Sequence, residues 1–487
     1  MTVPFVLARD STLPLHRQIY EQWRTAILAG RFRRGGRVPS TRAFAETYGI
    51  SRVTVTAAYD QLLAEGYFQT RSGAGTFVSS ELPDDALRPI DVEAANVRIP
   101  PSVKLSKYAA RLGRIRQMPS SPQPLNLSNV SPDVSRFPFA LWRRLVARHL
   151  RDHPSGVLDH RAPPAGLPAL REAIAAYLAR ARAVRCSPDQ IVIVSGSQQA
   201  LDLCARLLLD PGDEVAVEEP GYPGAKQLFL AHGARVRTLP VTDAGVSLTR
   251  LTMRTRLVHV TPSHQFPVGV SMALGRRLEL LEWARSSGGV VLEDDYDSEY
   301  RYSGPPLPAM HGFADGASVI YIGTFSNVMF RGLRIGYVVV PQQLIEPFAT
   351  AKWMADRHTP LIEQAALAEF ISDGHLERHI RRMRRIYTRR RDAMLDALGR
   401  HFGERVEVRG DAAGLHMTVR FKGVRDLAAH ATRCGVHLSS SEIYYLRNKA
   451  GAAANEYILG FSAVSERVIR ESIKRLASIE NMQAVCR

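Results

Sequence analysis

The chain has 487 residues, of which 45% are hydrophobic and 23% are charged, and its formal net charge is +17. This length predicts two or three domains, and the composition is typical of a soluble globular protein. No segment is apolar enough to predict a membrane span, and the N-terminus lacks the basic start and apolar run of a secretory signal.

The four cysteines are far apart in the sequence and form no ligand pair, which argues against a disulfide framework or a zinc site. We therefore expect no metal and a reducing, cytoplasmic location. The high positive charge favours a polyanionic partner such as nucleic acid. An arginine-rich surface without such a partner is the alternative that charge alone leaves open.

The sequence divides into three regions that differ in composition and in the periodicity of their hydrophobic residues. Residues 1–80 are predicted as one small domain that ends in a glycine-rich hairpin. Residues 81–124 carry Pro and Ser with little periodicity and are predicted as a linker, with a short helix near 106–114. Residues 125–487 alternate apolar runs with amphipathic segments, as an α/β domain does. The expected strands are 191–194, 215–217, 257–260, 290–292, 319–322 and 336–340, and the clearest expected helices are 167–182 and 198–209.

The first region has the pattern of a helix-turn-helix. Leu15, Ile19, Trp23 and Ile27 recur four residues apart and predict a first helix with one apolar face. Two further helices are predicted in the segment that follows. Their expected boundaries are a cap at Ser40, an end at Gly49 and a second cap at Ser51, with Val55, Tyr59 and Leu62 on the buried side.

The third predicted helix begins with small and basic residues, Ser51-Arg52-Val53-Thr54, which suit a recognition helix that meets phosphates and base edges. The segment TRSGAGTFV after it predicts a wing, with Arg71 placed for phosphate. Ten arginines against five acidic residues in the first 80 favour DNA over the alternative, a protein-interaction module.

The segments PLHRQIYEQWRTAILAGRF, VPSTRAFAE and SRVTVTAAYDQLLAEGY, with the wing, resemble the winged helices of the GntR superfamily. The contacts with double-stranded DNA that this resemblance implies come from Arg42, Arg52, Thr54 and Thr56, with Gly73 and Gly75 at the wing tip.

The rest of the chain resembles a fold-type-I aminotransferase, an α/β domain with a mixed, mostly parallel sheet and flanking helices. Its landmarks are VSGSQQAL, EEPGYPGA, TPSHQFPVGV, LEDDYDSEYRY and IGTFSNVMFRGLRIGY. The order of parts is that of the MocR regulators, which join such a domain to a GntR winged helix. The resemblance therefore implies a transcription regulator with promoter DNA and a small effector as its ligands, and a homodimer as its assembly.

The same resemblance implies a site for pyridoxal phosphate. Ser197, Gln198, Thr324, Ser326 and Arg334 would hold the phosphate, since a helix N-terminus and a forked guanidinium both suit an anion. Asp294 would pair with the ring nitrogen, Tyr296 with the phenolic oxygen, and Tyr222 would stack on the ring.

One position departs from the family. The residue after GTFS is a lysine in fold-type-I enzymes and most MocR relatives, and its amine forms a Schiff base with the cofactor. Here it is Asn327, whose amide is neither basic nor nucleophilic, and no lysine lies between Lys226 and Lys352. We therefore predict no catalytic residue and no transamination. Arg331 stands where the family has a small residue or proline, which adds a second positive charge near an anion.

Three interpretations of the large domain remain open from the sequence. It binds pyridoxal phosphate or an amino-acid adduct without a covalent link, it binds another anionic effector, or it is a ligand-blind dimerisation core. A rival from another class is a divergent aminotransferase or lyase that carries a DNA-binding head. The sequence favours the first interpretation, since Asp294 is informative only opposite a ring nitrogen.

Overall fold

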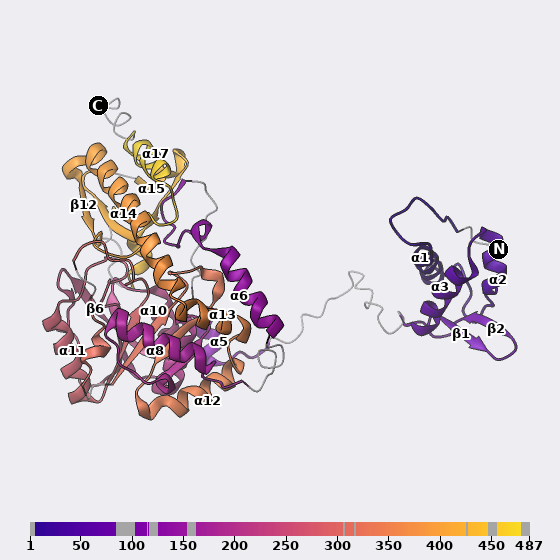
Figure 1. The fold of residues 1–487 in the computed structure, drawn as a ribbon, viewed down its shortest axis with the longest axis horizontal. Helices are drawn as coiled ribbons and strands as arrows, with labels where there is room; N and C mark the ends of the chain where they lie inside the picture. The colour runs from indigo at the N-terminus through magenta and orange to yellow at the C-terminus, as the bar shows by residue number, and fades with distance from the viewer. Residues whose placement is uncertain are drawn as a thin grey trace. The chain divides into compact units, whose positions relative to one another are not determined.

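The computed structural model describes residues 5–83, 103–113, 115, 125–152, 162–304, 307–315, 318–424, 427–446 and 455–478. The chain forms two compact units, Met1–Lys104 and Leu105–Arg487 (Figure 1). The short helix predicted within residues 81–124 is present as α5 (Lys107–Leu112), and the Ser106 side chain caps it by accepting a hydrogen bond from Ala109 N at 3.1 Å. Helix α5 belongs to the second unit, so that unit begins before residue 125.

The first unit is a winged helix-turn-helix. Its elements are α1 (Leu15–Leu28), α2 (Thr41–Tyr48), α3 (Arg52–Ala64), β1 (Phe68–Arg71) and β2 (Gly75–Val78). Ser40 and Ser51 cap α2 and α3 as predicted, and Gly49 ends α2 in the left-handed conformation with φ of 59°. The wing is an antiparallel hairpin that pairs Phe68 with Val78.

Aromatic side chains fill the core of this unit. Trp23 of α1 is 1% exposed and lies 5.3 Å from the ring of Phe68, centroid to centroid. Tyr59 of α3 packs against the same ring at 5.1 Å. Because one tryptophan joins helix α1 to the wing, the three helices and the hairpin share one core.

The second unit is built on an eight-stranded sheet in the order β4-β11-β10-β9-β8-β5-β6-β7. The strands from β10 to β6 are parallel, whereas β11 and β7 run antiparallel to their neighbours. The strands are β4 (Ile191–Val194), β5 (Glu214–Glu219), β6 (Arg235–Thr242), β7 (Gly245–Val246), β8 (Thr255–Val260), β9 (Val290–Asp295), β10 (Val319–Thr324) and β11 (Gly336–Val339). All six predicted strands are confirmed, and β6 and β7 are additional.

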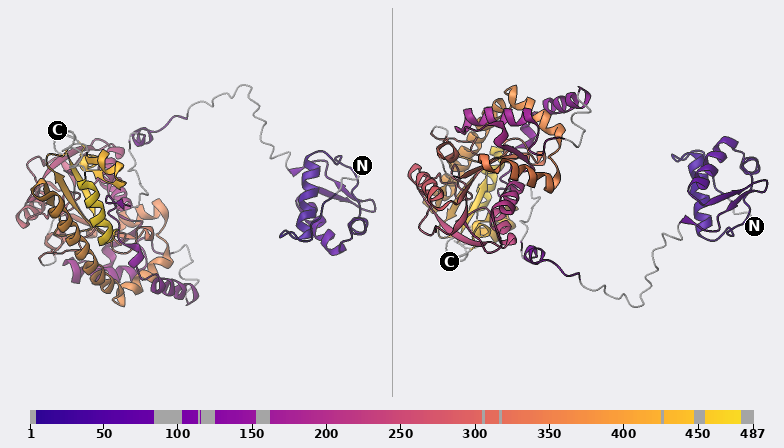
Figure 2. Two further views of the ribbon diagram at one scale, coloured as in Figure 1. Left: turned by 90° about the horizontal axis from the view of Figure 1, so that it is seen from above. Right: turned by 90° about the horizontal axis from the view of Figure 1, so that it is seen from below.

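Helices cover both faces of this sheet (Figure 2), because alternate strand residues face opposite sides. Val215 and Val217 face the cluster that holds Phe229 and Phe348, whereas Ala216 faces the cluster that holds Leu280. The helices are α8 (Pro168–Arg182), α9 (Ser197–Leu208), α10 (Pro223–His232), α11 (Leu274–Ser287), α12 (Ile345–Asp356) and α13 (Leu361–Ser372).

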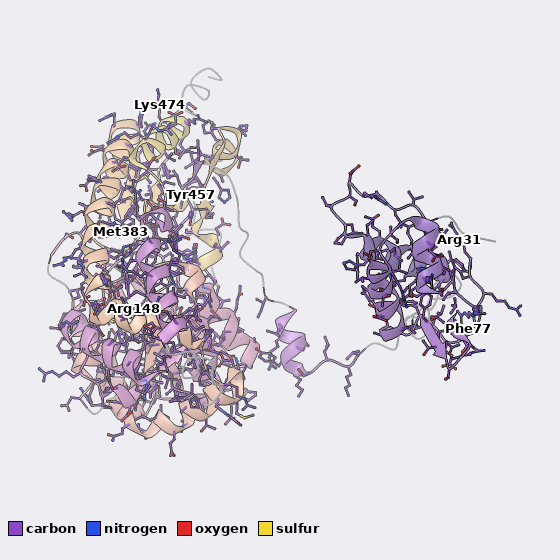
Figure 3. All side chains as sticks on the ribbon, turned by 45° about the vertical axis from the view of Figure 1, so that its right-hand side comes forward. Arg31, Phe77, Arg148, Met383, Tyr457 and Lys474 are labelled. Carbon is purple, nitrogen blue, oxygen red and sulfur yellow. The ribbon has the colours of Figure 1, made fainter. Side chains whose placement is uncertain are left out.

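A smaller four-stranded sheet, order β12-β13-β16-β15, lies toward the C-terminal end. The remaining elements of this part are β3 (Leu125–Asn126), α6 (Phe139–Asp152), α14 (His375–Phe402), β12 (Val406–Arg409), β13 (His416–Phe421), α15 (Leu427–Arg433), β14 (Val436–His437), β15 (Ser439–Ser440), β16 (Glu456–Gly460) and α17 (Glu466–Ala477). Met383 of α14 and Tyr457 of β16 are buried (Figure 3). No described helix is long and apolar enough to cross a membrane.

Candidate functional site

A cavity of about 660 Å³ lies where the parallel strands end at their carboxyl termini. Residues that follow β4, β5, β8, β9 and β10 line it, because parallel strands present their carboxyl ends at one edge of the sheet. The structure brings all nine predicted cofactor residues to this cavity: Ser197, Gln198, Tyr222, Asp294, Tyr296, Thr324, Ser326, Asn327 and Arg334.

One end of the cavity is suited to a phosphate. Ser197 begins α9, and the N-terminus of a helix is suited to bind an anion through its first backbone N–H groups. The guanidinium of Arg334 donates to the Ser195 carbonyl at 2.6 Å. A Cβ at Gly196 would lie 3.1 Å from Arg334 Nη2, so glycine leaves room for the guanidinium beside the helix N-terminus. Arg334 itself adopts φ of 52°, a strained conformation typical of functional sites.

Asp294 carries the clearest sign of a missing partner. This residue is 5% exposed, and its Oδ2 lies 3.2 Å from His259 Nε2. Its Oδ1 is buried and has no hydrogen-bond partner among the described residues. An unpaired buried carboxylate oxygen is costly, and the protonated nitrogen of a pyridine ring would satisfy it. The donor set therefore fits pyridoxal phosphate at both ends.

Two tyrosines stand between these ends. Tyr222 precedes α10 and donates from its hydroxyl to Gln198 Oε1 at 3.2 Å. Tyr296 places its hydroxyl 2.9 Å from His264 Nδ1. Burial raises the pKa of Tyr222 and raises the pKa of Tyr296 well above its usual range. Both phenols therefore stay protonated and serve as neutral hydrogen-bonding groups.

No described residue that lines the cavity is a lysine. Asn327 donates from Nδ2 to the Tyr296 carbonyl at 2.9 Å, so its amide fixes the loop. Lys226 of α10 is 4% exposed, and its Nζ lies 2.6 Å from Glu219 and 2.7 Å from the Tyr444 carbonyl. Burial lowers the pKa of Lys226, but both contacts hold its amine in the protein.

The cavity also contains residues that sequence analysis missed. They come from the stretch after the linker, from the loops after β8 and β9 and from the C-terminal part, and they are Asn126, Ser128, Asn129, Val130, Ser131, Thr261, Phe266, Asp297, Leu415, Ser439 and Tyr444. Asn126 reaches the site because β3 pairs in parallel with β14, more than 300 residues further along the chain. The cluster of Asn and Ser residues at 126–131, directly after the predicted linker, could have indicated polar site residues in the sequence.

Among the described residues, one buried group has metal-ligand chemistry, namely His264, Asp297 and His416, with ligand atoms within 4.8 Å of one another. His264 Nδ1 lies 3.0 Å from Asp297, and its Nε2 lies 3.4 Å from the Gly410 carbonyl. Because both imidazole nitrogens of His264 have protein partners, this group is a hydrogen-bonded support for Tyr296.

The predicted DNA-contacting residues of α3 lie on its first two turns. Ser51 and Arg52 are exposed there, and Thr54 and Thr56 are half-buried. Val53 between them is 79% exposed, although it is apolar, and sequence analysis did not select it. An exposed valine beside polar residues suits contact with a thymine methyl group.

The wing and the start of α2 supply the other predicted DNA contacts. Gly73 and Gly75 have φ of 73° and 106°, which permits the tight tip of the wing. Arg71 places its guanidinium 4.7 Å from the ring centroid of Phe77, a residue that Figure 3 shows on the wing. Arg42 of α2 is exposed and forms an ion pair with Glu46 at 3.1 Å.

Comparison with known proteins agrees with the division of the chain into a winged helix and an aminotransferase-like unit. Residues 15–78 match the model of the gntR family of bacterial regulatory proteins, and residues 143–455 match that of aminotransferase class I and II. The chain is 40% identical to the probable rhizopine catabolism regulatory protein MocR of Rhizobium meliloti, over 97% of this chain and 95% of that protein. It is 32% identical to the transcriptional regulator TauR of Rhodobacter capsulatus, over 98% and 99% of the two chains.

Solved structures support the fold of the second unit. The kynurenine aminotransferase of Pyrococcus horikoshii is 31% identical, with a TM-score of 0.68 over 78% of this chain and 95% of that one. LysN, the alpha-aminoadipate aminotransferase of Thermus thermophilus, is 29% identical, with a TM-score of 0.66 over 78% and 96%.

The two units together define a class of protein, a DNA-binding transcription regulator that joins a winged helix to an aminotransferase-like domain. The chain belongs to the GntR family of bacterial regulators, and within it to the MocR type.

Proposed function

We propose that this regulator senses a phosphopyridoxyl compound, pyridoxal phosphate or its pyridoxamine form, which it binds without a covalent link. One observation carries the proposal, namely that groups suited to the phosphate and to the ring nitrogen surround one cavity while the lysine position holds Asn327. Pyridoxal phosphate supplies an electron-withdrawing ring when it is bound. In this chain, we expect it to serve as a ligand only.

The residues that would hold the ligand have separate roles. Arg334 and the first turn of α9 would bind the phosphate, with the hydroxyls of Thr324 and Ser326 beside them. Asp294 would accept a hydrogen bond from the ring nitrogen through its unpaired Oδ1. Tyr222 would cover one face of the ring. Solved LysN, complexed with N-(5'-phosphopyridoxyl)-L-leucine, supports the idea that this fold accepts such an adduct.

Asn327 and the contacts of Lys226 argue against a transaminase. A transaminase needs an amine that forms a Schiff base and then carries protons. The Asn327 amide can do neither, and the Lys226 amine is held by Glu219 and by the Tyr444 carbonyl. We therefore expect no turnover of amino acids in the presence of pyridoxal phosphate.

In this proposal the protein acts as a cytoplasmic homodimer whose two winged helices bind promoter DNA. The ligand would change the relative affinity of the dimer for two arrangements of its DNA-binding units. Its effect is limited to the difference in free energy with which it binds these two states.

The test is calorimetric titration with pyridoxal phosphate, using Arg334→Ala and a control, Arg254→Ala, which removes an exposed arginine outside the cavity. Loss of a forked, charge-assisted phosphate contact should weaken pyridoxal phosphate binding about 100-fold. The affinity of Arg334→Ala for a DNA duplex selected by this protein from a random pool should be unchanged. Equal pyridoxal phosphate affinities for Arg334→Ala and the control would sink the proposal.

A further inference from the structure

A second cavity of about 610 Å³ adjoins the one described above. The two cavities share Asn129, Ser131 and Arg331, so they meet at these side chains. The rest of the second cavity is lined by Pro132, Asp133, Val134, Ser135, Phe139, Phe330, Gly332 and Ala463. We call this second cavity the annex.

The annex is mostly apolar, and part of its apolar lining faces solvent. Phe139 is 49% exposed and Val134 is 47% exposed. Phe330 completes the aromatic wall, since its ring lies 5.6 Å from that of Phe139, centroid to centroid. Asp133 is the one acid in this lining, and Arg390 holds it at 2.7 Å. The annex therefore suits an apolar group and offers no free carboxylate.

Arg331 lies where the two cavities meet, and most of its hydrogen-bond donors are available to a ligand. It begins a single 3-10 turn, Arg331–Leu333, which ends at Arg334. One of its nitrogens, Nη2, donates to the Val130 carbonyl at 3.1 Å, which orients the guanidinium. Within the described parts of the chain Arg331 forms no ion pair, and a guanidinium carries five N–H donors in a fixed fork.

The other charged groups of the main cavity have partners in the protein or a place in the proposed ligand site, where Asp294 Oδ1 would meet the ring nitrogen. Asp294 contacts His259, and Asp297 lies 3.0 Å from His264. Arg334 stands at the phosphate end, where it donates to the Ser195 carbonyl. Arg331 is thus a second positive charge beside Arg334, and it lines both the polar cavity and the apolar annex, whereas Arg334 lines the polar cavity alone. A planar fork in that position matches a carboxylate.

We propose that Arg331 binds the carboxylate of an amino acid joined to the phosphopyridoxyl group, and that the annex takes the apolar side chain of that amino acid. The ligand class is then a phosphopyridoxyl adduct of an apolar amino acid, bound through three features: phosphate, carboxylate and side chain. This inference rests on the proposed function and extends it to the identity of the ligand.

The test uses three stable reduced adducts and the full-length protein, with binding measured by calorimetry. N-(5'-phosphopyridoxyl)-L-leucine carries both the α-carboxylate and an apolar side chain. The 3-methylbutylamine adduct lacks only the carboxylate, and the L-aspartate adduct keeps the α-carboxylate but lacks the apolar side chain. Because a bidentate arginine–carboxylate pair is strong, we expect the leucine adduct to bind at least about ten-fold more tightly than the 3-methylbutylamine adduct. We expect a similar margin of about ten-fold over the aspartate adduct, because an apolar side chain gains free energy when the annex removes it from water, whereas a carboxylate there would be desolvated without a partner.

The variants assign this preference to one side chain. Arg331→Ala should bind the leucine and 3-methylbutylamine adducts within about two-fold of each other, because the carboxylate has lost its partner. Arg331→Lys should show an intermediate preference, since an ammonium keeps the charge but loses the fork. Affinity for the 3-methylbutylamine adduct should be the same in Arg331→Ala and the unaltered protein, which confirms that the variant is folded.

Each adverse outcome has a distinct meaning. If the protein binds all three adducts equally, or if Arg331→Ala keeps the preference for the adduct with a carboxylate, then Arg331 does not bind the ligand carboxylate. If the aspartate adduct binds as tightly as the leucine adduct, the annex does not select an apolar side chain. If none of the adducts binds but pyridoxal phosphate does, this inference fails and the proposed function stands. If pyridoxal phosphate also fails to bind, both fail.

Discussion

Asn327 has a shorter side chain than lysine and an amide in place of the amine, and this amide is engaged within the protein. Its Nδ2 contacts the Tyr296 carbonyl, so the side chain has a structural task in the loop. Among the residues that the structure describes, Asp294 Oδ1 is buried without a hydrogen-bond partner, which costs free energy unless a ligand supplies one. In our proposal, this site therefore recognises the ring through Asp294 and has no amine for catalysis at position 327.

His379 is a second residue whose burial has a measurable consequence, here for the pH dependence of stability. It is 6% exposed, its Nε2 lies 3.1 Å from the Val328 carbonyl, and burial, with the charge of Arg382, lowers its pKa to about 4. The pKa of His379 is lower in the folded state than in the unfolded state. The contribution of the neutral His379 to the free energy of unfolding is therefore fully present above about pH 6.5 and is lost as the pH falls toward about 4. We expect His379 to account for about 2 kcal/mol of unfolding free energy lost between about pH 7 and about pH 5.

The variant His379→Gln keeps a donor for the Val328 carbonyl but does not titrate in this range. Its melting temperature, followed by calorimetry, should fall less between these pH values than that of the unaltered protein. His401→Gln, near the other end of α14, is the control and should behave as the unaltered protein does. An identical pH dependence for His379→Gln would show that His379 is not the titrating group.

At the scale of elements, the segments predicted correctly are those whose local pattern and burial agree. Every residue of β4 is fully buried and β-branched, and such runs predict a central strand. Strand β13 was missed, because it carries His416 and Thr418, which are buried through hydrogen bonds to the Pro267 carbonyl. The motifs likewise indicated nine cavity residues, whereas Asn126 and Ser128 depend on the distant pairing of β3 with β14.

The recognition helix α3 gives a prediction at this scale. Arg52 is the exposed first residue of α3, beside the helix N-terminus that faces the DNA in our proposal. Arg52→Ala should weaken binding of a selected duplex about ten-fold and reduce the slope of log affinity against log salt by about one, as loss of one phosphate contact does.

Fluorescence anisotropy at several salt concentrations measures both quantities for Arg52→Ala. Arg250→Ala removes one exposed arginine from the second unit and controls for net charge. If both variants weaken binding equally, the effect comes from overall charge, and Arg52 makes no specific contact.

The whole molecule combines a DNA-binding unit with an aminotransferase-like unit, and each has its own core. In the second unit α9 and α10 both begin at the cavity. Helix α5, the first described helix after the winged helix, docks at the far end of α10, where Arg111 donates to the Ala231 carbonyl at 2.6 Å. Helix α10 therefore runs from the cavity to α5, the short helix that lies within the predicted linker.

The central claim is that the cavity binds pyridoxal phosphate without a covalent link. The most direct measurement is titration with pyridoxal phosphate, followed by calorimetry and near-visible absorbance, then borohydride reduction and mass analysis of the intact chain. Asn327→Lys serves as the positive control and should gain a reducible one-to-one adduct. The account predicts saturable binding and an unchanged mass for the unaltered protein. Absence of binding, or a reducible adduct on the unaltered chain, would contradict it.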